Sequence, residues 1–147
     1  MARSRFLDYP RGRLLAVVDD AAGVDRARAG LRAAGFDDGD VEVLSGADAA
    51  DRIDATGKRH GPLSRLVRAI QFGLMDQLPD LAWYEAALRS GHAVLVVRAA
   101  DLAAARRAHA ALVPAGAHFI NHFGRFETAD LEPWRGPEPA VSQLFKR

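Results

Sequence analysis

Two short apolar runs constrain the fold of this 147-residue chain more than any other feature. Residues 14–18 (LLAVV) and 92–97 (HAVLVV) are rich in β-branched side chains, and apolar residues occupy consecutive rather than alternate positions. Such runs are typical of strands that are buried on both faces of a sheet. We therefore expect these two segments to form the central strands of a sheet that is covered on both sides.

Each of these runs begins a strand–helix–strand pattern. After the first run, Asp20 is placed to cap a helix that Gly35 ends, and residues 41–44 then form a short strand. After the second run, Asp101 caps a helix that a Pro-Ala-Gly sequence ends, and residues 118–123 alternate in the manner of a strand. The sequence therefore contains two β-α-β units.

Two such units predict the α+β class, with a ferredoxin-like βαββαβ antiparallel sheet in the strand order 4-1-3-2. Strands one and three are central in that order, which fits the two apolar runs, and strands two and four are edges. Residues 46–90 are predicted to be a helical insertion between strands two and three. We expect one domain over residues 1–135 and a C-terminal tail, residues 136–147, that is partly flexible or docks on a partner.

The predicted helices of the two units cover only one face of the sheet, so the other apolar face needs a cover. Within the insertion, residues 63–74 carry an apolar stripe at helical spacing, and residues 81–88 mark a second helix that starts after a Pro-Asp pair. Either this helical pair or a second subunit could cover the open face. Near the C-terminus, Phe126, Leu131 and Trp134 are expected to dock on the body.

Composition excludes several classes of protein. The net charge is +1, from 20 basic and 19 acidic residues, so the chain as a whole is not a basic nucleic-acid binder. It contains no cysteine, which excludes disulfides and thiolate metal sites. No apolar run reaches the roughly 20 residues of a membrane helix, and the N-terminus does not resemble an export signal. We expect a cytoplasmic protein with no cofactor and with neither a membrane nor a nucleic-acid partner.

Aspartates, histidines and a serine gather at one end of the predicted sheet. In the antiparallel order, strands one and two end where strands three and four begin, and the inserted loop starts from the same edge. Histidine beside aspartate is the composition of a zinc or non-haem iron site and of an acid/base pair. Alternatively, the aspartates only cap a helix and end a strand, and because the spacings match no metal motif, metal binding stays open. The candidate ligand-binding residues are Asp19, Asp20, Ser45, His60, His92 and His118.

The last predicted strand carries candidates for a subunit interface. His118 and His122 are expected to share a face about 13 Å apart, which is too far to chelate one ion. Histidines on an edge strand usually lie at a surface or interface, where they can form a pH-sensitive contact. The candidate interface residues are Phe119, His122, Phe123 and Arg125. We therefore expect a homo-oligomer, most simply a dimer.

The opposite end of the sheet collects arginines, namely Arg11, Arg13, Arg98 and Arg125. Arginine forks bind phosphate or carboxylate, but they also form salt bridges with aspartate on a solvated surface. The sequence contains no Gly-rich phosphate loop, no nucleophile elbow and no His-Glu-x-x-His. These observations favour a protein that is not an enzyme.

Several stretches resemble the heat-induced general stress protein family of the YflT type and its uncharacterised actinobacterial relatives. They are Val-Asp-Asp after the first central run, Ala-Gly-Phe, Val-Leu-Ser-Gly, YEAALRSGH at 84–92 and HFINHFGRF at 118–126. The resemblance covers roughly residues 14–131 and implies a cytoplasmic, stress-linked bacterial protein without assigned catalytic residues. Many members have a glycine-rich apolar middle segment, where this chain has a helix with Arg65 and Arg68, so a membrane role does not carry over.

Taken together, the sequence predicts a non-enzymatic, stress-associated protein that acts through self-association and with a partner or small ligand. The alternative is a small enzyme or ligand sensor, with or without a metal, whose His/Asp pocket lies between the sheet and the inserted helices. The residues expected to line that pocket are Phe72, Met75, Trp83 and Tyr84. A polar cavity beside the histidines would favour the alternative.

Overall fold

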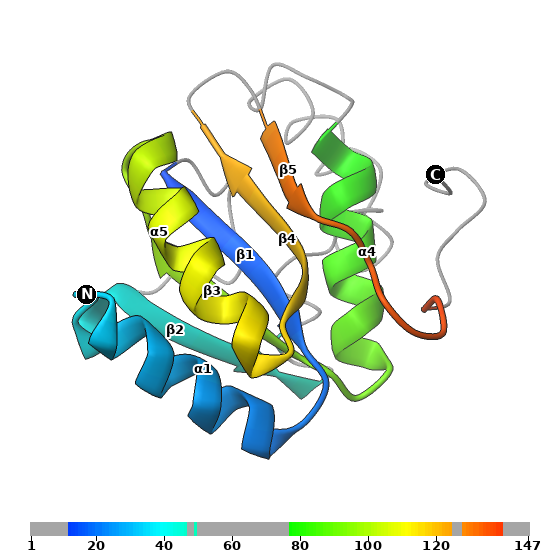
Figure 1. The fold of residues 1–147 in the computed structure, drawn as a ribbon. Coiled ribbons are helices and arrows are strands. Elements are labelled where there is room, and N and C mark those ends of the chain that lie inside the picture. Colours follow the sequence, from blue (N-terminus) through cyan, green and yellow to red (C-terminus); the bar gives the residue numbers. More distant parts are fainter. Residues whose placement is uncertain (1–11, 47–48, 50–76, 125–127, 140–147) are drawn as a thin grey trace, which may run out of the picture.

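The two apolar runs form β1 (Arg13–Val18) and β3 (Ala93–Arg98), which pair antiparallel inside one open sheet. The computed structural model describes residues 12–46, 49, 77–124 and 128–139. Its five-stranded sheet has the order β2-β3-β1-β4-β5, and neighbouring strands are antiparallel (Figure 1). The remaining strands are β2 (Val41–Ser45), β4 (His118–Phe123) and β5 (Thr128–Glu132). The predicted α+β class is confirmed.

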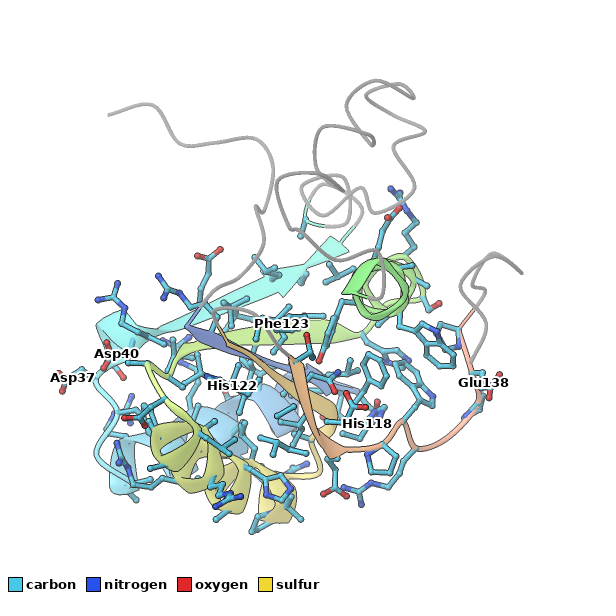
Figure 2. All side chains as sticks on the ribbon, turned by 90° about the horizontal axis from the view of Figure 1, so that it is seen from above. Asp37, Asp40, His118, His122, Phe123 and Glu138 are labelled. Atoms are coloured by element: carbon cyan, nitrogen blue, oxygen red, sulfur yellow. The ribbon has the colours of Figure 1, made fainter. Side chains whose placement is uncertain are left out.

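Helices α1 (Ala21–Ala33) and α5 (Leu102–Leu112) cover one face of the sheet (Figures 1 and 2). Each begins at the predicted aspartate, because Asp20 accepts a hydrogen bond from a backbone N–H at 2.7 Å and Asp101 accepts one at 2.8 Å. These bonds satisfy backbone donors that have no partner within the first turn of a helix. Alanine and leucine side chains of both helices then pack on the alternate side chains of β1 and β3 that face this side.

The other face of the sheet is covered by α4 (Gln77–Arg89) (Figure 2). Its Trp83, Tyr84 and Leu88 belong to a buried cluster with β1 and β3 residues that face away from α1 and α5. The prediction that this helix starts after the Pro-Asp pair is wrong by several residues. Proline is accommodated in the first turn because its missing N–H has no helical partner there. The predicted helix at residues 63–74 lies outside the described residues.

β4 is not an edge strand, contrary to the sequence-based expectation. β5 pairs with its last four residues, with Asn121 opposite Asp130 and Phe123 opposite Thr128, and every residue of β4 is buried. The chain beyond β4 also docks as expected, since Leu131 packs on the α1/α5 side and Trp134 on the α4 side. Phe126 lies outside the described residues.

The burial of β4 corrects the placement of the predicted interface residues. Phe119 and Phe123 lie in the core under α4, and His122 is buried with its Nε2 2.8 Å from the carbonyl oxygen of Ala99. These three side chains are therefore buried within the chain itself and do not lie on an exposed edge strand. Arg125 lies outside the described residues.

A buried tyrosine ties α4 to the two strands beneath it. The Tyr84 hydroxyl lies 2.9 Å from the carbonyl oxygen of Leu15 and 2.7 Å from that of Phe119, and Asn121 Nδ2 donates to it at 2.9 Å. Turning the amide over instead places Nδ2 2.8 Å from Asp130 Oδ1, with the Tyr84 hydroxyl donating to Asn121. In both orientations Asn121 is hydrogen-bonded to α4, and burial raises the pKa of the Tyr84 hydroxyl well above its usual value.

The raised pKa predicts a loss of stability in alkaline solution. Above about pH 10 the unfolded chain releases the Tyr84 proton while the folded chain keeps it, so stability is full below that pH and falls above it, by up to about 1.4 kcal/mol per pH unit. Tyr84→Phe should remove this component, as measured by urea unfolding at a series of pH values. An equally steep alkaline loss in Tyr84→Phe and wild type would contradict the prediction.

Candidate functional site

The candidate site depends on an irregularity in β4. Phe119 has φ = 46°, a left-handed conformation that is rare for a bulky side chain. The pairing with β1 slips at this point, because Leu15 is opposite Asn121 whereas Val17 is opposite His118. β4 therefore contains one more residue than the matching part of β1. Such β-bulges re-aim the side chains beside them and are common next to functional sites.

The bulge turns His118 toward the face that α4 covers. In a regular strand His118 would face the same side as Ile120 and His122, which lie on the α1/α5 side. Instead its ring packs edge-on against Trp134, with ring centroids 4.7 Å apart, and Trp134 belongs to the cluster under α4. The prediction that His118 and His122 share one face is therefore wrong.

Hydrogen bonds fix the protonation pattern of His118, whose side chain is only 2% exposed. The backbone N–H of Arg135 donates to Nδ1 at 3.1 Å. Because a backbone amide nitrogen can only donate, Nδ1 is the ring nitrogen without a proton. The proton is on Nε2, which donates to Asp19 Oδ1 at 2.7 Å. His118 is thus a neutral imidazole with both nitrogens occupied.

The chain after β5 closes over the bulge as a strap, residues 133–137. The Phe119 N–H donates to the carbonyl oxygen of Pro133 at 2.9 Å, and the Arg135 guanidinium donates to that of Ala117 at 3.0 Å. Figure 2 shows His118 at the end of β4 beside this segment. The strap therefore holds the residues on both sides of His118 as well as His118 itself.

Asp19 joins His118 to a second histidine. The Asp19 side chain is 57% exposed, and His92 Nδ1 lies 3.5 Å from the same Oδ1 atom, an ionic contact rather than a short hydrogen bond. The His92 ring is 25% exposed and lies edge-on to Trp134, with centroids 5.7 Å apart. Gly91, with φ = 96°, ends α4, and the His92 N–H donates to the carbonyl oxygen of Ala87 at 3.0 Å. This glycine cap fixes where His92 leaves the helix.

A cleft of about 300 Å³ opens at the same end of the sheet, on the α1 side. It lies between the first turns of α1 and the adjoining ends of β2 and β3. Two of the predicted residues line it, and it includes both chain neighbours of His92. Its lining residues are Asp20, Ala21, Val24, Asp25, Val43, Ser45, Gly91 and Ala93.

The structure thus brings five of the six candidate residues to one end of the sheet, and His60 lies outside the described residues. Asp19, His92 and His118 are in contact, while Asp20 and Ser45 line the cleft. Sequence analysis placed Trp83 and Tyr84 in the pocket, but both are buried core residues and do not line this cleft. Phe72 and Met75 lie outside the described residues.

Two residues of the site were missed as site residues, Trp134 and Arg135. Trp134 was expected only to dock on the body. An aromatic side chain next to prolines in a polar segment could have indicated that it belongs to a site. Arg135 contacts His118 through its backbone N–H, which no side-chain pattern could indicate.

The chemistry of the site is that of hydrogen-bond acceptance. Among the described residues, no group of histidines, aspartates and glutamates is arranged to hold a metal ion. His118 is enclosed and has no nitrogen left for a substrate. Within the same part of the chain, His92 Nε2 has no hydrogen-bond partner, and the His92 ring lies against Trp134 and His118 rather than in the cleft.

The far end of the sheet carries the predicted arginines that the structure describes. Arg13 and Arg98 are directly opposite one another in β1 and β3, and Arg13 Nη1 donates to the carbonyl oxygen of Gly12 at 3.3 Å. Arg11 and Arg125 lie outside the described residues. Along β1, basic and acidic side chains therefore stand at opposite ends.

None of the helices in the described ranges is long and apolar enough to cross a membrane.

The hydrogen bonds of His118 predict an unequal effect of two histidine substitutions in β4. His118→Phe should lower the free energy of unfolding by about 2–4 kcal/mol, because it removes one bond to a carboxylate and leaves the Arg135 N–H without its partner. The matched variant His122→Phe loses a single bond to a backbone carbonyl and should cost about 1–2 kcal/mol. Urea unfolding measures both, and equal losses would argue against the hydrogen bonds assigned to His118.

Comparison of the chain with protein-family models, with curated proteins and with solved structures found no match. The resemblance to the general stress proteins therefore rests on the sequence stretches that carry it, and the function of the site is argued from its geometry.

Proposed function

We propose that this chain is a small-molecule-binding protein whose ligand occupies the cleft lined by Asp20 and Ser45, at the end of the sheet that also carries Asp19 and His118. The observation that carries the proposal is a cleft of about 300 Å³ at the same end of the sheet as Asp19, an exposed carboxylate that a buried histidine holds in place. This volume is at the lower end of the range for small-molecule sites. The surrounding residues come from helix and strand ends of one sheet, which favours a preorganised site.

The position of Asp19 supports a role beyond local structure. Asp20, not Asp19, caps α1, because its side chain accepts the hydrogen bond from Gly23. Asp19 is therefore free of the capping duty that aspartates at this point usually have. It is nevertheless oriented by a buried histidine, which is itself oriented by the strap. A carboxylate that only ended a strand would need neither partner.

The same geometry favours binding over catalysis. His118 has no open nitrogen and almost no exposure, so it does not exchange a proton with a bound molecule. Ser45 lines the cleft, but no histidine base is hydrogen-bonded to it among the described residues, and a serine nucleophile needs such a base. We therefore retain the prediction of a non-enzymatic protein and assign it a small ligand.

Other parts of the proposal go back to the sequence. We propose a ferredoxin-like βαββαβ core with β5 as an added edge strand, supported by the adjacency of β4, β1, β3 and β2 and by α1 and α5 on one face. A cytoplasmic, stress-linked role follows from the resemblance. Self-association as a dimer also stays a proposal. It needs surfaces other than the enclosed β4 residues and the face that α4 covers.

Native mass spectrometry of the protein purified from its own host tests the binding function. The wild type should carry a small molecule that is released on unfolding. Ala21→Phe, which fills the cleft, should lose that molecule, whereas Ala33→Phe, an exposed alanine at the other end of α1, should keep it.

Two results would overturn the proposal. One is a wild-type protein that carries no small molecule and that no fraction of a metabolite extract stabilises against heat more than it stabilises Ala21→Phe. The other is a molecule that Ala21→Phe retains as well as the wild type does, because that molecule then lies elsewhere.

A further inference from the structure

We propose that His118 makes the closure of the strap dependent on pH, so that the strap is held in neutral solution and released in mildly acidic solution. The inference goes beyond the proposed binding function and does not depend on it. The feature that carries it is the acceptor position of His118 Nδ1, to which the backbone N–H of Arg135 donates at 3.1 Å. An imidazole nitrogen accepts a hydrogen bond only while the ring is neutral.

Protonation of His118 reverses the role of that nitrogen. Nε2 already carries a proton, which it donates to Asp19 Oδ1 at 2.7 Å. The next proton therefore binds Nδ1, because an imidazolium carries a proton on both ring nitrogens. The new N–H then points at the N–H of Arg135, and a backbone amide nitrogen cannot accept it. The strap loses this hydrogen bond, and two donors face each other in its place.

The closed and the open strap differ in how well they accommodate the charged ring. In the closed state the His118 side chain is only 2% exposed, and a proton on Nδ1 faces another donor. In the open state water can accept from that N–H. The bond from Nε2 to Asp19 does not involve the strap, so it is present in both states and does not favour closure. The open state therefore binds the proton more tightly, and closure weakens as the pH falls through the titration of His118.

One contact opposes this release. The His118 ring lies edge-on to Trp134, with centroids 4.7 Å apart, and a charged imidazole is attracted to an indole ring. The attraction is weaker than the combined loss of the Arg135 bond and of water around a charged N–H. The balance of these interactions therefore favours release.

Two other histidines lie near the strap, and neither explains a release in acid. His109 of α5 has its Nε2 2.8 Å from Glu132 Oε1, so a charge on His109 strengthens a contact at the base of the strap. His92 Nδ1 lies 3.5 Å from Asp19 Oδ1, and a charge on His92 increases its attraction to that carboxylate. Among the described histidines, His118 is the one that accepts a hydrogen bond from the strap.

The other charged groups on the elements around His118 have partners of their own. The Arg135 guanidinium donates to the carbonyl oxygen of Ala117 and lies 3.6 Å from Glu132 Oε2. On α4, Arg89 and Glu85 form an ion pair at 3.2 Å. None of these contacts involves His118 Nδ1, so they leave its role as the acceptor unchanged.

The strap is braced within itself and lightly attached to the sheet. Trp134 Nε1 donates to the carbonyl oxygen of Pro137 at 3.1 Å, which links the two ends of the segment. Most of its residues are exposed. Segments with few buried contacts open at a small cost in free energy. Release would uncover Trp134 and the amide of Phe119, the residue with the strained positive φ.

Amide hydrogen exchange, followed by NMR on the full chain at about pH 8 and about pH 5, tests the proposal across the range in which histidines titrate. The amides to follow are those of Arg135 and Phe119, which donate to His118 and to Pro133. Their protection factors, which correct for the intrinsic effect of pH on exchange, should fall about tenfold or more in acid. The amides of the central strand β3 should keep their protection.

Two variants separate His118 from other sources of pH dependence. His118→Asn places an amide oxygen near the position of Nδ1, where it accepts from Arg135 and does not titrate, so the strap should stay protected at both pH values. His109→Gln keeps a donor for Glu132, and should respond to acid as the wild type does. The His118 ring signal of the wild type should titrate with the same midpoint as the loss of amide protection.

Unchanged protection of the Arg135 and Phe119 amides in acid would overturn the proposal, and so would a loss that β3 shares, because the whole fold would then be opening. An acid response in His118→Asn equal to that of the wild type, or its disappearance in His109→Gln, would assign the effect to another group. If His118→Asn does not fold, the two midpoints in the wild type decide, since different midpoints would exclude His118 as the cause.

Discussion

Because β1 and β3 bury side chains on both of their faces, each face must be closed by other parts of the chain. Helices α1 and α5 close one face, and α4 with Trp134 closes the other. The buried apolar area favours this arrangement strongly. It also sets where polar groups can remain, since only the strand ends escape from the two apolar layers. The candidate site lies at one of those ends.

β4 shows how buried polar side chains select one strand register, where burial of apolar side chains alone would allow several. Asn121, His118 and His122 are all buried, and each has a hydrogen-bond partner. A buried polar group without a hydrogen-bond partner destabilises the folded state. A shift of β4 by one residue would remove the partners of several such groups at once. The Tyr84 hydroxyl adds to this restraint by reaching the backbone of both β1 and β4. The register and the bulge are therefore fixed together.

Much of this organisation follows from local sequence. Consecutive apolar residues identified β1 and β3, and the aspartates before α1 and α5 identified their starts. Antiparallel geometry was enough to place Asp19, His92 and His118 at one end of the sheet. β5 was not predicted as a strand, because its sequence, TADLE, is largely polar and forms a strand by pairing with β4. The bulge at Phe119 has no local signal either, since positive φ normally calls for glycine or asparagine. Both depend on contacts between distant segments.

The strap sets the proton of His118 through a main-chain atom, and this has a consequence for how the chain can vary. The group that sets the proton of His118 is the amide N–H of Arg135, which every residue except proline possesses. A change of side chain at position 135 would lose the guanidinium bond to Ala117, but the amide that sets the proton of His118 would remain. Proline, which has no amide N–H, would be the residue that position 135 does not accept.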